Sequence, residues 1–129
     1  MRITGQSLAK FKYVQKNKTY MNSKIVFVDS KLQEEFSNLK DSKKENKQLY
    51  NWIITAFEKI EENPFCGIQI PKKLIPKEYL TKYQIKNLWK CNLPQGWRLL
   101  YTVKNNNVVI LSIVIEWMSH KDYENKFNY

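Results

Sequence analysis

Apolar residues recur every three or four positions along the middle of the chain. The residues that follow this spacing are Leu49, Trp52, Ile53, Ala56, Phe57 and Ile60. A 3.6-residue period places them on one face of a helix, and Asn63-Pro64 gives that helix an end. The pattern therefore predicts a helix of at least three turns whose apolar face, including Trp52 and Phe57, lies in the core.

Two further elements are predicted before this helix. Residues 25–28 form a short β-branched and aromatic run, typical of a buried strand. Asp29 or Ser30 then caps a helix that ends near Asp41. Its apolar face is formed by Leu32, Phe36 and Leu39. Two amphipathic helices joined by the polar connection 42–47 make an antiparallel hairpin that packs on a sheet.

The second half of the chain alternates in the manner of strands. Residues 85–91, 97–103 and 108–118 are apolar runs separated by turn-forming residues at 93–96 and 104–107. Gly and Asn tolerate the left-handed backbone conformation that such turns require. These runs predict a three-stranded antiparallel meander.

The remaining segments complete an α+β fold class. Residues 65–83 contain Gly, Pro and Lys without a period, which predicts a long irregular connection with one helical turn at 77–81. Residues 119–127 predict a short C-terminal helix. The expected order is thus an N-terminal strand, an antiparallel helix hairpin, a three-stranded antiparallel meander and a short C-terminal helix.

The positive charge is unevenly distributed over the chain. The formal net charge is +10, with +6 in residues 1–24, −2 in 25–62, +7 in 63–104 and −1 in 105–129. Such a distribution favours a polyanionic partner, nucleic acid or an acidic polypeptide, although lysine-rich surfaces also serve solubility alone. Residues 1–24 are expected to form a basic N-terminal extension, and residues 25–129 a single domain.

Cysteine spacing and hydropathy indicate a cytoplasmic protein. Cys66 and Cys91 lack Cys-x-x-Cys spacing, and His120 is the one histidine in the sequence, so neither a zinc site nor a disulfide framework is predicted. Residues 1–24 interrupt their apolar positions with lysines, unlike a signal peptide. The longest apolar run, 108–115, is too short to cross a membrane.

Lysine, arginine, histidine and tyrosine gather in the segment 87–123. These side chains can bind a phosphodiester, move protons and stabilise a negatively charged transition state without a metal. In a strand, Lys86 and Lys90 share one face, and Arg98 shares a face with Leu100. If these basic residues face away from the helices, they form a cationic concavity, but the pattern alone leaves the choice of face open. RNA cleavage is the first hypothesis.

Several short motifs resemble one known family. They are Asn63-Pro64, Leu74-Ile75-Pro76, Asn87-Leu88-Trp89-Lys90, Gly96-Trp97-Arg98-Leu99-Leu100-Tyr101 and His120-Lys121-Asp122-Tyr123. Together with the order of elements, they make residues 25–129 similar to the RelE/ParE superfamily of toxins from type II toxin-antitoxin systems. The Gly-aromatic-Arg-Leu-aliphatic-Tyr strand is the most specific part. The chain departs from the family in its basic extension and in its very apolar strand at 108–115.

The resemblance implies a set of site residues. Those implied as catalytic are Arg98, His120, Tyr123 and Lys90, and those implied as substrate-binding are Lys86 and Lys121. Arg98 matches the phosphate-binding arginine, and Tyr123 with His120 or Lys121 matches a C-terminal acid-base group. Each residue also has a structural alternative: Arg98 can pair with Glu116 or an acidic helix residue, His120 can be an exposed or capping residue, and Tyr123 can pack beneath the last helix.

The RelE-like activity that the resemblance implies is ribosome-dependent cleavage of messenger RNA. The ribose 2′-OH attacks the adjacent phosphorus and leaves a 2′,3′-cyclic phosphate, which inhibits translation. No metal or other cofactor is expected, and the partners are a cognate antitoxin, the ribosome and the message, with no membrane. The alternative is a non-catalytic ParE-like inhibitor of DNA gyrase, or a decayed toxin that only binds an antitoxin.

Overall fold

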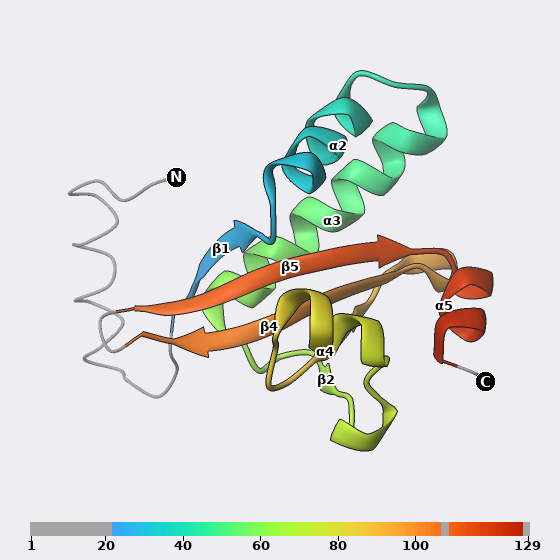
Figure 1. Ribbon diagram of the computed structural model, residues 1–129. Coiled ribbons are helices and arrows are strands. Elements are labelled where there is room, and N and C mark those ends of the chain that lie inside the picture. Colours follow the sequence, from blue (N-terminus) through green and yellow to red (C-terminus); the bar gives the residue numbers. More distant parts are fainter. Residues whose placement is uncertain (1–21, 107–108, 128–129) are drawn as a thin grey trace.

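A five-stranded mixed sheet forms the centre of the protein, and helices cover both of its faces (Figure 1). The computed structural model describes residues 22–106 and 109–127. The strand order is β1-β5-β4-β3-β2. Four α-helices lie within the described residues, so the α+β class is confirmed. The predicted division at residue 24 is not tested, because residues 1–21 lie outside the described part.

The helix hairpin consists of α2 (Ser30–Lys40) and α3 (Lys44–Glu62). Asp29 caps α2, because its carboxylate oxygen accepts a hydrogen bond from the Leu32 backbone N–H at 2.9 Å. The buried face of α3 carries Leu49, Ile53, Ala56, Phe57 and Ile60. The predicted stripe is confirmed, with Trp52 partly buried against the core. The connection is shorter than predicted, since α3 already begins at Lys44.

Three antiparallel strands form the predicted meander: β3 (Trp89–Asn92), β4 (Arg98–Asn105) and β5 (Ile110–Met118). The meander continues into strands on both sides. β1 (Lys24–Phe27) pairs in parallel with β5, and β2 (Ile68–Gln69) pairs antiparallel with β3. The prediction of a buried first strand was wrong in one respect, because β1 lies at an edge and its apolar residues are only partly buried.

The predicted strand 85–91 was too long at its start. β3 begins only at Trp89, because the side chain of Asn87 replaces part of the ladder. Its carbonyl oxygen accepts from the Val103 backbone N–H at 2.9 Å and from the Thr102 hydroxyl at 3.0 Å, and its amide nitrogen donates to the Val103 carbonyl at 3.0 Å. A side chain that satisfies the neighbouring strand in this way ends regular pairing.

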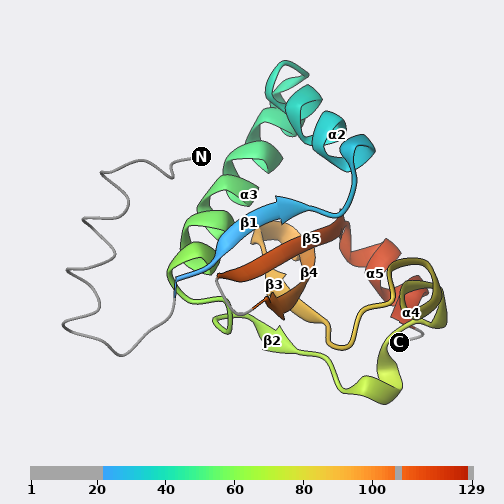
Figure 2. The same cartoon turned by 60° about the vertical axis from the view of Figure 1, so that its left-hand side comes forward.

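The segment after α3 is more regular than predicted. It contains β2, the 3₁₀ turn η1 (Lys72–Leu74) and the helix α4 (Lys77–Tyr83), which extends beyond the single turn expected at 77–81. Figure 2 shows β2 at the sheet edge opposite β1, and α4 close to α5 (His120–Phe127). The predicted C-terminal helix is confirmed by α5, and Ser119 caps it, because its hydroxyl oxygen accepts a hydrogen bond from the Asp122 backbone N–H at 3.2 Å.

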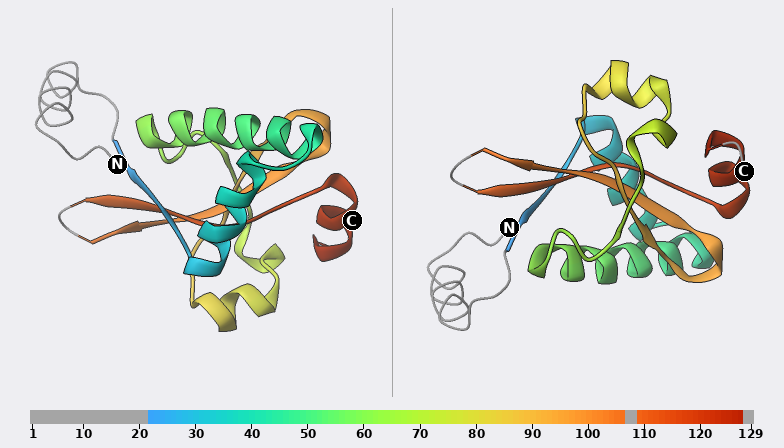
Figure 3. Two further views of the ribbon diagram at one scale, coloured as in Figure 1. Left: turned by 90° about the horizontal axis from the view of Figure 1, so that it is seen from above. Right: turned by 90° about the horizontal axis from the view of Figure 1, so that it is seen from below.

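The two faces of the sheet have separate apolar cores. Leu99, Tyr101 and Val114 pack with α3 on one face. Leu100, Ile115 and Met118 pack on the other face with Tyr79 of α4 and with Tyr123 and Phe127 of α5. The two views in Figure 3 show the sheet between these two layers of helices. This settles the choice of face that the pattern left open: Arg98 and Leu100, two residues apart in β4, face α4 and α5.

Candidate functional site

Arg98 is the first residue of β4, and the adjoining turn and helix surround its guanidinium. Its Nη1 donates to the carbonyl oxygen of Gly96 at 2.5 Å and, more weakly, to that of Trp97 at 3.5 Å. Its Nη2 lies 3.3 Å from Nδ1 of His120. A guanidinium has only donors, so Nδ1 is the acceptor in this contact. The strand end and the start of α5 are thereby joined through two of the predicted site residues.

His120 is the first residue of α5, and its ring has a partner at each nitrogen. Nε2 lies 3.0 Å from Oε2 of Glu124, one helical turn further along. The side chains of this pair are 54% and 46% exposed. Because Nδ1 accepts from Arg98, the neutral ring carries its proton on Nε2 and donates it to Glu124. The unprotonated nitrogen therefore faces the arginine.

Lys90 and Tyr123 form the other half of the cluster. The Lys90 Nζ donates a hydrogen bond to the Tyr123 hydroxyl at 3.1 Å and lies 4.9 Å from the centre of that ring. The guanidinium carbon of Arg98 is 5.0 Å from the same ring centre. Tyr123 is 1% exposed and stacks on Phe127 at 4.4 Å between ring centres. The aromatic ring thus orients two cations, and its burial leaves it no surface for stacking on a base in this conformation.

The turn between β3 and β4 allows the close approach of α5. Gln95 and Gly96 both have positive φ, 58° and 80°. A Cβ atom built on Gly96 would lie 2.8 Å from the Cβ of His120, closer than such atoms approach in proteins. Glycine is therefore needed at this position for two reasons: it adopts the left-handed backbone without strain, and it has no Cβ to collide with His120.

Arg98 has a buried donor that is unsatisfied. Its Nε is buried and has no hydrogen-bond partner among the described residues. The predicted alternative, a pair between Arg98 and Glu116, does not occur, since Glu116 instead accepts a hydrogen bond from the Tyr79 hydroxyl and lies 3.7 Å from Lys126. Within the described residues, Arg98 is therefore a cation that no carboxylate pairs with. Its buried Nε–H without an acceptor is also costly in free energy.

Four of the six predicted site residues meet in this place: Lys90, Arg98, His120 and Tyr123. Lys86 does not lie in a strand, as the prediction required, and is exposed before β3. Lys121 is exposed on α5, and no contact within the described residues joins it to the cluster. Glu124 was missed by sequence reasoning, although its position four residues after His120 on a helix is a usable signal.

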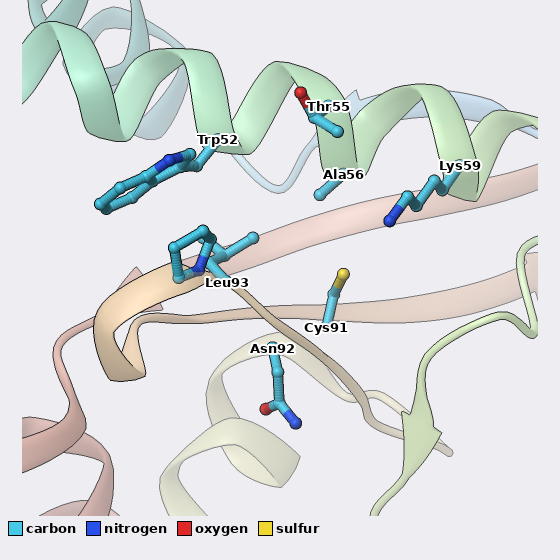
Figure 4. A pocket seen from close by; sticks show the side chains of 8 residues that line it. Trp52, Thr55, Ala56, Lys59, Cys91, Asn92 and Leu93 are labelled. Atoms are coloured by element: carbon cyan, nitrogen blue, oxygen red, sulfur yellow. The ribbon is translucent and has the colours of Figure 1, made fainter.

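A hollow of the described surface lies on the opposite side of the sheet from this cluster. Figure 4 shows it between α3 and the end of β3, with Trp52, Thr55, Ala56 and Lys59 on the helix side. Its volume is about 440 Å³, and Cys91 and Leu93 line its other wall. The Asn92 side chain points away from α3 in this view. The hollow and the cationic cluster are therefore separate features.

The described part of the chain also bears on metal sites, membrane-spanning helices and the two cysteines. Residues 22–106 and 109–127 contain no group of three or more His, Cys, Asp or Glu side chains that could hold a metal ion. No helix in this part is long and apolar enough to cross a membrane. Cys66 and Cys91 are both free thiols.

Residues 28–115 match the family model described as ParE toxin of type II toxin-antitoxin system, parDE. The chain belongs to this family. The ParE toxin family lies within the RelE/ParE superfamily, and membership makes the protein the toxin of a type II system with an antitoxin as partner. Neither the curated proteins nor the solved structures contain a match. The ParE toxin match includes Lys90 and Arg98 and ends before α5, so His120, Tyr123 and Glu124 lie beyond it.

Proposed function

We propose that this ParE-family toxin is a metal-independent endoribonuclease that cuts messenger RNA on the ribosome. The single observation that carries the proposal is the contact between Arg98 and His120, at 3.3 Å between Nη2 and Nδ1. The Tyr123 ring lies against the guanidinium of Arg98, and its hydroxyl accepts a hydrogen bond from Lys90. A phosphate-binding cation and an imidazole base in contact are the two groups that cleavage by a ribose hydroxyl needs.

His120 acts as the base in the proposed reaction. The 2′-hydroxyl loses its proton to Nδ1, and the 2′-oxygen forms a bond to the adjacent phosphorus. The bond from phosphorus to the 5′-oxygen breaks, and that oxygen takes a proton from solvent. The products are a 2′,3′-cyclic phosphate and a free 5′-hydroxyl. A positioned base of this kind contributes roughly 10² to 10⁴ in rate.

Arg98 stabilises the negative charge that grows on the phosphoryl oxygens. Its contact with His120 is long for a hydrogen bond to a cation, and its Nε has no acceptor among the described residues. A phosphate oxygen can replace the long contact at Nη2 with a charge-assisted hydrogen bond. Displacing Nη2 from His120 also frees Nδ1 to act as the base.

Lys90 supplies a second positive charge on the same side of the sheet. It lies opposite Leu100 in the β3–β4 pair, on the face that carries Arg98. Tyr123 holds its ammonium by a hydrogen bond and by the face of the ring. In this proposal Tyr123 is a positioning residue, since its burial keeps it from the substrate.

The second candidate function is inhibition of DNA gyrase without catalysis. The observation that favours it is the matched family model, which is described as the ParE toxin. Binding to a protein target requires no base, so this candidate gives no role to the His120 nitrogen that faces Arg98. The two functions therefore differ in whether His120 is needed for toxicity.

The test uses 70S ribosomes programmed with a defined message, with mapping of the new RNA ends. Wild type is compared with Arg98→Ala, Arg98→Lys and His120→Ala, and Lys40→Ala on the exposed end of α2 serves as the matched loss of a basic residue. We expect wild type to cut within codons and to leave a cyclic phosphate on the new 3′ end. The cuts should be lost in Arg98→Ala, strongly reduced in Arg98→Lys and in His120→Ala, and retained in the control.

A supercoiling assay with purified gyrase separates the alternatives. Inhibition of supercoiling by a wild-type toxin that leaves the message intact would overturn the ribonuclease proposal and support the gyrase inhibitor. If the wild-type protein neither cuts the message nor inhibits supercoiling but still binds an antitoxin, it is a toxin that has lost its activity.

A further inference from the structure

The carboxylate of Glu124 has a defined place beside the proposed base. Its Oε2 lies 3.0 Å from Nε2 of His120, on the side of the ring opposite Arg98. We propose that Glu124 is a positioning residue for the reaction, which fixes the His120 ring with Nε2 protonated and Nδ1 open toward the phosphate site. This inference rests on the proposed ribonuclease function, because it assigns Nδ1 as the base.

The ring of His120 is held from two elements. Arg98 reaches Nδ1 from β4, and Glu124 reaches Nε2 from the same helix. These two are the charged groups that contact the ring in the described structure. The third neighbour is Gly96, whose lack of a side chain leaves room for the Cβ of His120. With both nitrogens engaged, the ring can neither turn over nor change tautomer without losing a contact.

The contact with Glu124 becomes more useful once substrate is bound. A phosphate that takes Nη2 of Arg98 removes the partner of Nδ1, and Glu124 is then what keeps the ring in place. As the 2′-hydroxyl proton moves to Nδ1, the ring becomes an imidazolium. The carboxylate at Nε2 stabilises that charge, while the 2′-oxygen bonds to phosphorus, the 5′-oxygen leaves and solvent supplies its proton.

The fold does not depend on this contact. Glu124 and His120 are about half exposed, and an exposed pair of this kind adds little to stability. The role of Glu124 can therefore be tested in a folded protein. Glu58, on the exposed side of α3, provides a matched carboxylate outside the cluster.

The first measurement is the rate of ribosome-dependent cleavage by Glu124→Gln, Glu124→Ala and the control Glu58→Ala. We expect Glu124→Ala to lose about tenfold, a part of the contribution of a positioned base, and Glu124→Gln to lose less because its carbonyl oxygen still accepts from Nε2. In a His120→Ala background, Glu124→Ala should cause no further loss, since Glu124 acts through the ring. An equal tenfold loss in both backgrounds would overturn the inference.

The second measurement does not depend on activity. His120 is the one histidine of the sequence, so ¹⁵N-histidine labelling gives the signals of a single ring. In long-range ¹H–¹⁵N spectra of the neutral ring, wild type and Glu124→Gln should show a protonated Nε2 and an unprotonated Nδ1. In Arg98→Ala, where Glu124 is the remaining charged partner of the ring, adding Glu124→Ala should move the two nitrogen shifts toward each other, as the second tautomer becomes populated.

The two measurements distinguish the failure of this inference from failure of the proposed function. If wild type cuts no message, the ribonuclease proposal fails, and the change in nitrogen shifts still supports Glu124 as the residue that positions the ring. If adding Glu124→Ala leaves the nitrogen shifts of Arg98→Ala unchanged, the positioning role is overturned, whether or not the message is cut.

Discussion

Lys90 donates a hydrogen bond to the hydroxyl of Tyr123 at 3.1 Å, and the Tyr123 ring lies in the core beneath α5 with 1% of its surface exposed. A tyrosine this deeply buried serves both the fold and the site. Its ring stacks on Phe127, and its hydroxyl and ring face hold a cation that would otherwise lie in water. The two roles can be separated by removing either the hydroxyl or the ring.

Tyr123→Phe should keep the fold and weaken the site. The ring remains to stack on Phe127, so the free energy of unfolding should fall by about 1 kcal/mol, the usual worth of one hydrogen bond. Tyr123→Ala should cost about 3–5 kcal/mol, because it leaves a cavity in the second core. Urea denaturation followed by tryptophan fluorescence measures both changes.

Cleavage should fall in Tyr123→Phe, because Lys90 loses the acceptor that orients its ammonium. Tyr50→Phe, on the outer hairpin, is the matched loss of a hydroxyl and should cleave as wild type. Equal destabilisation by Tyr123→Phe and Tyr123→Ala would mean that the hydroxyl, rather than the ring, carries the packing of α5, contrary to this interpretation.

Gly96→Ala should destabilise the protein and displace the start of α5. The added methyl group would lie 2.8 Å from the Cβ of His120, and φ at this position is +80°. A substitution where the native backbone is unfavourable for the new residue costs on the order of 1–3 kcal/mol. The melting temperature and the ¹⁵N shifts of His120 should both change.

Gln95→Gly provides the opposite change in the same turn. Gln95 has φ of 58°, so glycine relieves a left-handed conformation without entering the space of His120. The stability of this variant should be retained or raised, and the His120 shifts should remain those of wild type. A Gln95→Gly protein that is destabilised as much as Gly96→Ala would show that the turn tolerates no change at all, and would remove the steric explanation.

The protein should lose stability at alkaline pH. Burial and then the hydrogen bond to Glu116 raise the pKa of Tyr79 above its ordinary value of 10.0, and burial raises the pKa of Tyr101 in the same direction. A raised pKa means that the folded state keeps a proton that the unfolded state releases. The stabilisation is therefore complete below about pH 10 and is lost as the pH rises above it.

Tyr79→Phe should reduce this alkaline loss. The free energy of unfolding, measured in urea at pH 8 and at pH 10.5, should fall less between the two values in the variant than in wild type, because one of the buried phenols is gone. Tyr83→Phe on the same helix changes a partly exposed tyrosine and should follow wild type. A Tyr79→Phe protein with the full wild-type loss would contradict the assignment.

Much of the fold was predictable because each element carries its own period. The stripe of α3, the cap at Asp29 and the antiparallel meander follow from local spacing, and they were confirmed. The start of β3 could not be predicted in this way. It is set by the Asn87 side chain, which bonds to β4 sixteen residues away, and a local pattern contains no such partner.

The candidate site was predictable in its members but not in its geometry. Alternation placed Arg98 and Lys90 on strand faces, and the resemblance added His120 and Tyr123. The sequence left the burial of Tyr123 as one of two alternatives, and the structure confirms it; spacing alone could not decide, because burial depends on how α5 packs beside α4. Glu124 had no motif of its own, and it gains a role only because His120 begins the helix.

Association with the ribosome should depend on salt through the lysines that precede and begin α4. Lys72, Lys73 and Lys77 are exposed, and none forms an ion pair within residues 22–106 and 109–127. Each lysine that contacts a phosphate releases bound counterions, which adds roughly 0.7 to 0.9 to the slope of log affinity against log salt concentration. Replacing all three with glutamine should weaken binding and lower that slope.

The matched control replaces three exposed lysines of the helix hairpin, Lys40, Lys44 and Lys47, by glutamine. It changes the net charge by the same amount, so it accounts for long-range attraction, and it should leave the slope near that of wild type. The affinity of both variants for the ribosome is measured by co-sedimentation at salt concentrations from roughly 50 to 200 mM, over which such a slope is readily determined. Equal reductions in the two variants would mean that net charge, rather than the position of Lys72, Lys73 and Lys77, governs the association.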